Sequence, residues 1–238
     1  MSQILTCFSP ALFPHYLTEN SIAVIIDVFR ATTSICTAFQ NGAASVRTVA
    51  STTEAMDWQA KGRLVAAERN TQKCDFADFG NSPFDFTAEK VSGKEIVFTT
   101  TNGTRAVEAA FESDEIVIGA FSNISKLTEY CLSKKKNIIM VCSGWNNRFC
   151  HEDTLFAGAL AERLMAEGDF EVSCDASMAA IDLWKIAKAD LKNYLTRSEH
   201  YKRLKRNGLD HEVDYCLTDD LAPVLPIMNK EKKNFTLK

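Results

Sequence analysis

Residues 27–34 bring an acid, a base and several hydroxyl groups together. Asp27 ends an apolar run, Arg30 follows shortly after it, and Thr32 and Thr33 come next. A carboxylate at a strand end can hold Mg²⁺, and hydroxyl and backbone N–H groups at a helix start suit phosphate. Alternatively, Asp27 and Thr32 cap a helix and Arg30 is a surface charge. We expect a metal and phosphate site, because this set of groups exceeds what a cap needs.

A second loop, residues 99–105, is rich in threonine and also ends on an arginine. Asn102 and Gly103 allow the backbone to turn with positive φ, which exposes N–H groups beside the Thr104 hydroxyl and the Arg105 guanidinium. A guanidinium can bind an oxyanion through two N–H groups at once. The simpler interpretation is an Asn-Gly turn followed by a threonine cap. We expect a second anion-binding loop.

A third polar segment, residues 68–83, is long for a plain connection. Glu68 and Asp78 offer oxygen ligands to a metal, and Asn81 and Ser82 lie where a helix is expected to begin. Much of this segment could instead serve helix capping. We expect Glu68 to bind metal, and Asn81 and Ser82 to contact the substrate.

A fourth polar segment, residues 143–154, contains Glu152 and Asp153 where another helix is expected to begin. Acidic residues in a first helical turn are often present only because they complement the helix dipole. The segment nevertheless offers His151, Glu152 and Asp153 as candidates, and we take Asp153 as a further metal ligand or a catalytic base.

The elements that must position these loops are short apolar runs that alternate with helical patterns. Most runs are nearly continuous, which predicts strands covered on both faces. The alternation predicts an α/β fold with right-handed crossovers and a mostly parallel or mixed sheet. Ligands of such sheets bind outside the carboxyl ends of the strands, where the polar loops fall. Strands are expected at residues 22–28, 45–49, 64–67, 95–100, 115–118 and 137–142.

Two stretches of the chain look like copies of one unit. Residues 23–49 and 96–118 each run from a strand through a threonine-rich loop with an arginine into a helix and a further strand. This similarity predicts an internal duplication. We therefore expect residues 1–238 to form one compact unit, with residues 1–92 and 93–230 as two similar subdomains.

The last third of the chain shows helical patterns at residues 152–167 and 175–188, with a charged continuation through 192–206. Beyond these, residues 213–218 and 224–228 suggest edge strands, since Pro226 suits a central strand poorly. Residues 229–238 are expected to be disordered.

Composition limits the classes of function. Among 238 residues, 46% are hydrophobic, and 27 basic against 31 acidic residues give a net charge of −4. There is no broad basic field for nucleic-acid binding. No apolar run is long enough for a membrane span, and the start lacks a secretory pattern, so we expect a cytoplasmic protein without membrane contact. The eight scattered cysteines, without a C-x-x-C pair, are expected as core residues in a reducing compartment.

Several common catalytic motifs are missing from the sequence. It contains no P-loop, no strand-linked G-x-G-x-x-G and no G-x-S-x-G elbow. The histidines show no zinc-binding spacing, which favours oxygen-ligated metal chemistry over zinc. His200 and His211 lie among charged residues and are expected to be solvated.

Taken in order, several blocks of the sequence resemble the 2-phosphosulfolactate phosphatase family. They are IDVFRATTS at 26–34, ER at 68–69, DFGNSP at 78–83, TTTNGTR at 99–105, VCSG at 141–144 with ED at 152–153, and DYCL at 214–217. The resemblance implies a three-layer α/β/α fold with internal duplication, Mg²⁺-dependent release of phosphate from 2-phosphosulfolactate, and a link to coenzyme M biosynthesis. It points to these site residues: Asp27, Arg30, Glu68, Asn81, Asn102, Arg105 and Asp153.

Our working hypothesis assigns roles to these groups. Asp27 holds Mg²⁺ with Glu68 or Asp153, and Arg30 and Arg105 neutralise phosphoryl charge. Asp27 or Asp153 is the base, or Asp27 is a nucleophile that forms an aspartyl-phosphate. The remaining contacts to a small anionic phosphorylated substrate are expected from Thr32, Thr33, Asn81, Ser82, Asn102, Gly103 and Thr104.

The same residues also fit other classes of protein. A non-catalytic sensor of phosphorylated or sulfonated metabolites would keep the arginines without the metal, and a phosphotransferase or lyase would use the same fold. A homodimer is expected only because such assemblies are common.

Overall fold

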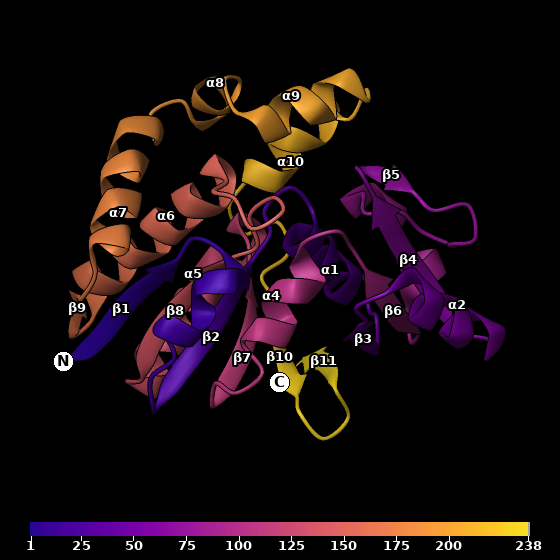
Figure 1. Ribbon diagram of the computed structural model, residues 1–238, viewed down its shortest axis with the longest axis horizontal. Helices are drawn as coiled ribbons and strands as arrows, with labels where there is room; N and C mark the ends of the chain where they lie inside the picture. Colours follow the sequence, from indigo (N-terminus) through magenta and orange to yellow (C-terminus); the bar gives the residue numbers. More distant parts are fainter. Residues whose placement is uncertain (238) are drawn as a thin grey trace.

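The computed structural model describes residues 1–237, and one large mixed sheet forms its centre (Figure 1). The strand order is β5-β4-β6-β3-β11-β10-β7-β2-β8-β1-β9. The strands are β1 (Ser2–Cys7), β2 (Ser21–Ile26), β3 (Ser45–Thr48), β4 (Leu64–Arg69), β5 (Gln72–Lys73), β6 (Glu95–Thr99), β7 (Glu115–Gly119), β8 (Asn137–Cys142), β9 (Phe170–Val172), β10 (Pro226–Asn229) and β11 (Asn234–Leu237). The expected mixed, mostly parallel sheet is confirmed, although β1 and β9 escaped prediction.

Two groups of parallel strands make up most of this sheet. Strands β4, β6 and β3 pair in parallel, and so do β7, β2, β8, β1 and β9. The antiparallel hairpin of β10 and β11 joins the groups, with Ile227 opposite Val117 of β7 and Phe235 opposite Val46 of β3. The sheet is therefore continuous from one group to the other.

Helices cover both faces of the sheet and give three layers, α/β/α (Figure 1). The main helices are α1 (Ala31–Gln40), α2 (Thr52–Ala60), α3 (Ala88–Val91), α4 (Gly103–Ala109), α5 (Ile124–Lys134), α6 (His151–Glu167), α7 (Asp175–Ala187), α8 (Leu191–Leu195), α9 (Glu199–Arg206) and α10 (Val213–Leu217). Short 3₁₀ turns lie at Pro10–His15, Pro83–Asp85, Phe121–Asn123 and Asp210–Glu212.

Alternate side chains of β2 enter two different cores, because successive residues of a strand point to opposite faces. Val24 packs in the core formed with α5 and α6, which includes Leu127 and Leu160. Ile25 packs in the opposite core, with Ile35 of α1. Every residue of β2 is buried, which explains the continuous apolar pattern of this strand. A smaller core under α2 covers the outer strands β4 and β6.

The two similar stretches are both strand-helix-strand units in the structure, β2-α1-β3 and β6-α4-β7. Strand β2 pairs with β7, and β3 pairs with β6. Each parallel group thus contains strands from both units, so residues 1–92 and 93–230 are interlaced through the sheet. A duplication as the origin of this arrangement stays a prediction.

The expected helix at residues 192–206 is wrong as one element. It is two helices, α8 and α9, and the break lies at Ser198, whose hydroxyl accepts a hydrogen bond from the Tyr201 N–H at 3.1 Å. The expected strand at 213–218 is also wrong, because Val213–Leu217 forms α10. Val213 and Cys216 are buried on one side of this short helix, which is helical rather than alternating spacing.

The end of the chain is ordered, so the prediction of disorder for residues 229–238 is wrong over 229–237, and Lys238 lies outside the described residues. Phe235 is fully buried in the sheet's core, and this anchors β11 despite the charged turn before it. The prediction that residues 224–228 lie at an edge is also wrong. Strand β10 lies inside the sheet, where Pro226 is tolerated as its first residue.

Two of the class expectations concern the whole molecule. Within residues 1–237 there is no helix long and apolar enough to cross a membrane. All eight cysteines are free thiols, and six of them are buried. Burial raises the pKa of the Cys36 thiol to about 12, in keeping with a role as a core side chain.

Candidate active site

Loops that follow four strands meet around a small, mostly buried cavity, which we call the inner pocket. Its volume is about 10 Å³, enough for about one water-sized group. Loops after β2, β4, β6 and β8 contribute, and helix α9 adds one side chain. The lining residues are Asp27, Phe29, Arg30, Glu68, Thr71, Asn81, Thr100, Asn102, Trp145 and His200. The sequence therefore identified Asp27, Arg30, Glu68, Asn81 and Asn102 correctly as neighbours.

Asp27 is held at the end of β2 by the turn that follows it. The Thr32 hydroxyl accepts a hydrogen bond from the Asp27 N–H at 3.1 Å, and the Thr33 hydroxyl donates to the Val28 carbonyl at 3.1 Å. Both hydroxyls are thus engaged in shaping the loop, and neither threonine lines the inner pocket. Burial raises the pKa of the Asp27 carboxyl to about 6; His200 opposes this rise and Glu68 adds to it.

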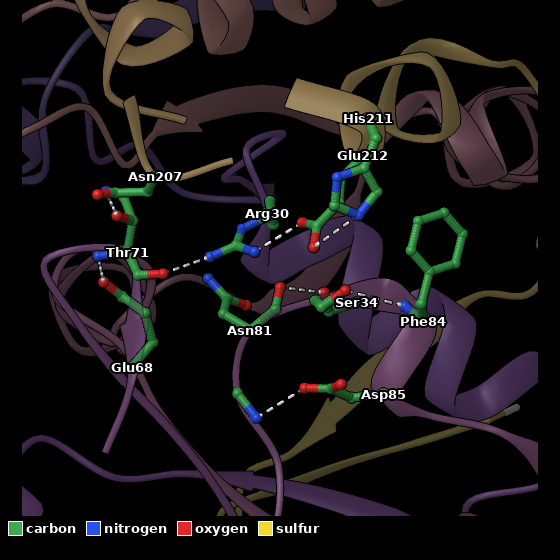
Figure 2. Close-up of polar contacts among 12 residues, drawn as sticks. Arg30, Ser34, Glu68, Thr71, Asn81, Phe84, Asp85, Asn207, His211 and Glu212 are labelled. Carbon is green, nitrogen blue, oxygen red and sulfur yellow. Dashed lines mark hydrogen bonds and ion pairs between the residues drawn. The ribbon is translucent and has the colours of Figure 1, made fainter. Parts of the chain in front are cut away.

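Glu68 supplies the second carboxylate of the inner pocket and is buried at the end of β4. It accepts hydrogen bonds from the Thr71 N–H, drawn in Figure 2, and from the Thr101 N–H at 3.3 Å. These contacts fix the carboxylate beside Asp27, and its negative charge disfavours the ionised form of Asp27.

Arg30 already has partners for its charge (Figure 2). Its Nη1 donates to Glu212 Oε2 at 2.6 Å, and its Nη2 donates to the Thr71 carbonyl at 3.0 Å. The Arg30 and Glu212 side chains are only 4% and 2% exposed. Glu212 therefore balances the one arginine of the inner pocket, and the pocket as a whole is acidic. Sequence reasoning missed Glu212, because it lies far along the chain in an unremarkable charged stretch.

Two asparagines add amide groups to the inner pocket. The Asn81 Oδ1 atom is buried and has no hydrogen-bond partner among residues 1–237, while its carbonyl accepts from the Ser34 hydroxyl at 2.8 Å (Figure 2). Asn102 Oδ1 accepts a hydrogen bond from the Asn146 N–H at 3.1 Å and so ties two loops together. A buried oxygen without a donor is an available ligand for a cation.

Gly103 follows Asn102 and lets the two related loops approach each other. A Cβ atom at this position would lie 3.0 Å from Asp27 Oδ2 and 3.2 Å from the Ala31 Cβ. A larger residue here would press on the Asp27 carboxylate, so glycine allows the closest approach of the two loops. Thr104, next along, donates its hydroxyl to the Thr100 carbonyl at 3.2 Å and supports the loop from behind.

His200 and Glu152 form a buried pair that the sequence did not reveal. His200 Nδ1 lies 2.5 Å from Glu152 Oε1, and both side chains are almost fully buried. Although burial acts to raise it, the pKa of the Glu152 carboxyl is lowered by the charge and hydrogen bond of His200. The expectation of a solvated His200 is wrong, because its place on α9 faces the core beside Tyr201 and Leu204. His211 is exposed, as expected.

Asp153 is buried next to the inner pocket without lining it. Its Oδ1 accepts from the Val28 N–H at 2.9 Å, and its Oδ2 accepts from the Gly144 N–H at 3.0 Å. Burial, with the carboxylates of Glu152 and Asp27, raises the pKa of Asp153 well above its ordinary value. These contacts hold the loops after β2 and β8 together; a role as metal ligand or base stays a prediction.

Two further candidates lie outside the inner pocket. Arg105 is exposed on α4, and Ser82 is half-buried, where its hydroxyl caps the turn Pro83–Asp85 by accepting from the Phe84 N–H at 3.3 Å. Ser82 therefore serves as a helix cap in the structure, which is the alternative that the sequence left open for this segment.

The donors available to a metal are of two kinds. Asp27, Glu68 and Asn81 offer oxygen atoms to the inner pocket, the set that Mg²⁺ prefers. Within residues 1–237, the one cluster of three potential ligands within 4.8 Å of one another is Cys150, Glu152 and His200. Burial and neighbouring carboxylates raise the pKa of the Cys150 thiol, so this group is a protonated neighbour of Glu152.

The fold and the inner pocket together define an α/β protein whose strand-end loops surround an acidic site with oxygen donors of the kind that hard cations prefer. The chain also matches the family model described as 2-phosphosulpholactate phosphatase over residues 7–231. A probable 2-phosphosulfolactate phosphatase of Thermotoga maritima is 40% identical over 210 residues, which cover 88% of this chain and 90% of that protein. Another of that name, from Synechocystis sp., is 35% identical over 230 residues, 94% and 95% of the two chains.

This chain therefore belongs to the 2-phosphosulfolactate phosphatase family, as the ordered sequence blocks predicted.

Proposed function

We propose that this protein is a Mg²⁺-dependent phosphatase that hydrolyses 2-phosphosulfolactate to sulfolactate and phosphate, a reaction linked to coenzyme M biosynthesis. Its family and the names of its relatives support the substrate class. A small metabolite as substrate also accords with a cytoplasmic location. A homodimer stays an expectation.

The charge balance of the inner pocket is the observation that carries the metal requirement. Asp27 and Glu68 are buried carboxylates, and the one arginine, Arg30, is already balanced by Glu212. A phosphate dianion would be repelled by this set of charges. A divalent cation held by the two carboxylates and the Asn81 oxygen would cancel their negative charge and offer a positive ligand to the phosphoryl oxygens, and Mg²⁺ is commonly bound by one or two carboxylates plus substrate phosphate. When bound, it would stabilise the negative charge on the reacting phosphoryl group.

The residues of the chain then have distinct tasks. Asp27 and Glu68 would hold the cation, and Asn102 holds the loop of Asn146 against the pocket. Arg30 fixes the position of the Thr71 loop through its hydrogen bond to the Thr71 carbonyl.

His200 is the group that supplies the leaving oxygen with a proton. In doubly protonated His200, the Nδ1–H donates to Glu152, which is ionised at neutral pH, and the Nε2–H is the proton available to the leaving oxygen. As water forms a bond to phosphorus and the bond to the C2 oxygen breaks, that oxygen takes the Nε2 proton and leaves as an alcohol. General acid catalysis of this kind contributes about 10²- to 10⁴-fold.

Phosphate release from 2-phosphosulfolactate, measured with Mg²⁺ and with EDTA, tests this function. We expect release that stops on chelation, returns with Mg²⁺ and is lost in Asp27→Asn. Equal rates with and without chelator would refute the metal requirement. A phosphorylated acceptor, or an unsaturated product, would instead identify a phosphotransferase or a lyase.

A further inference from the structure

A larger cavity adjoins the inner pocket, and we call it the basic pocket. Its volume is about 420 Å³, and Arg148, Arg197 and Arg203 line it. Trp145 and His200 line both cavities, so they form the boundary between the two. The basic pocket lies under the loop after β8 and against α9, away from the loops of Asp27 and Glu68.

The inner pocket alone cannot hold a whole phosphorylated acid. Its volume of about 10 Å³ accepts about one water-sized group. The parts of a substrate beyond the reacting phosphoryl group need other space, and the basic pocket provides it directly across Trp145 and His200.

The charges of the basic pocket are not balanced by its own carboxylates. Among residues 1–237, none of its three arginines forms an ion pair with an acidic side chain. The two acidic residues of its wall have other partners, Glu152 with His200 and Glu199 with Lys202 at 2.9 Å. The surplus charge is therefore positive.

Arg203 is the most constrained of the three arginines. Its guanidinium lies 3.7 Å from the centre of the Trp145 ring, and its Nε and Nη2 atoms are buried with no hydrogen-bond partner among residues 1–237. Buried N–H donors on a cation are costly to leave unpaired, so such groups point to a missing anionic partner. Arg197 lies at the rim, its guanidinium 3.7 Å from the centre of the Tyr194 ring.

We propose that the basic pocket binds the sulfonate of 2-phosphosulfolactate while the phosphoryl group faces the inner pocket. This inference rests on the proposed function. Of the two acid groups that do not react, the carboxylate is attached directly to C2, whereas the sulfonate is one bond farther and better able to reach across the boundary. A sulfonate also offers three equivalent oxygen acceptors to several guanidinium groups.

Steady-state kinetics with two substrates tests the inference on the full chain with Mg²⁺. The substrates are 2-phosphosulfolactate and 2-phospholactate, in which a hydrogen replaces the sulfonate. Arg203→Gln is expected to lower kcat/KM for the sulfonated substrate by about 10- to 100-fold more than for 2-phospholactate. Arg197→Gln, an exposed change that leaves the core intact, is expected to act in the same direction. Arg206→Gln is the matched control, because Arg206 is exposed on α9, the helix that carries Arg203.

Equal losses on both substrates in Arg203→Gln and Arg197→Gln would overturn the inference. A second readout separates it from the proposed function: calorimetric binding of sulfolactate and of lactate. If the wild type releases phosphate from neither substrate, the proposed function fails. In that case, sulfolactate binding that Arg203→Gln weakens would still support the basic pocket as a sulfonate site. If the wild type binds sulfolactate no more tightly than lactate, the inference is overturned.

Discussion

The buried Asp27 carboxylate should lower the free energy of unfolding of the metal-free protein, compared with a protein that has a neutral side chain at this position. Asp27 is 8% exposed, and burial is the main cause that raises its pKa from the ordinary 3.8 to about 6. Because the folded pKa is the higher one, folding favours the protonated form. The stabilising contribution is full below pH 3.8 and is lost as the pH rises through 6. At 1.36 kcal/mol per pH unit, the ionised carboxylate costs about 3 kcal/mol at pH 7.

Asp27→Asn keeps the shape of the side chain and can still accept the hydrogen bond from the Ala31 N–H. In EDTA at pH 7 we expect this variant to have a larger free energy of unfolding than the wild type, by about 1–3 kcal/mol. The gap should narrow at pH 5 and close below pH 4, where the wild-type carboxyl is protonated as well. Urea denaturation at pH 7, at pH 5 and below pH 4 measures this difference in the free energy of unfolding.

Mg²⁺ should reverse the order of the two proteins. The cation stabilises the wild type by binding its folded form, and Asp27→Asn loses most of this effect. Asp57→Asn, an exposed carboxylate on α2, is the control and should change neither the stability nor its pH dependence. A metal-free Asp27→Asn protein that is less stable than the wild type at pH 7 would refute the reasoning.

Three further predictions concern other charged groups of the inner pocket and their partners. Glu68→Gln should weaken the stabilisation by Mg²⁺, seen as a smaller rise in Tm on titration; an unchanged rise would remove Glu68 from the metal site. Glu212→Gln should lower the free energy of unfolding by about 3–5 kcal/mol, because it leaves the Arg30 charge buried and unpaired, and a loss below about 1 kcal/mol in urea would contradict this. His200→Asn should lower kcat by about 10²- to 10⁴-fold without lowering the Tm response to Mg²⁺, whereas an unchanged kcat would exclude it as the acid.

Most of the parallel part of the fold, without β1 and β9, and half of the site follow directly from the sequence. Continuous apolar runs marked the central strands, and polar residues directly after them marked the loops that meet in the inner pocket. Asp27, Glu68 and Asn102 could be grouped in this way because each follows a strand closely. The local sequence is enough to place these three residues. It shows where each strand ends, and the ends of parallel strands lie at the same edge of the sheet.

The other half of the site depends on packing between distant segments. His200 and Glu212 lie on the C-terminal helices, and nothing in their local sequence relates them to strand ends. The buried positions His200, Tyr201 and Leu204 share one face of α9, but the dense charges of this helix hid the pattern. Phe235 shows the same limit, because one buried aromatic residue outweighs the charged turn beside it.

The C-terminal segment therefore completes the chemistry that the strand-end loops begin. Arg30 is balanced by Glu212, and the Thr71 hydroxyl accepts a hydrogen bond from the Asn207 amide (Figure 2). Helix α9 also contributes His200 to the inner pocket and Arg203 to the basic pocket. The loops proposed to bind the metal and the groups proposed to protonate the leaving oxygen and to bind the sulfonate thus belong to different segments. On this proposal, changes on α9 alter which acid is accepted while Asp27 and Glu68 stay in place.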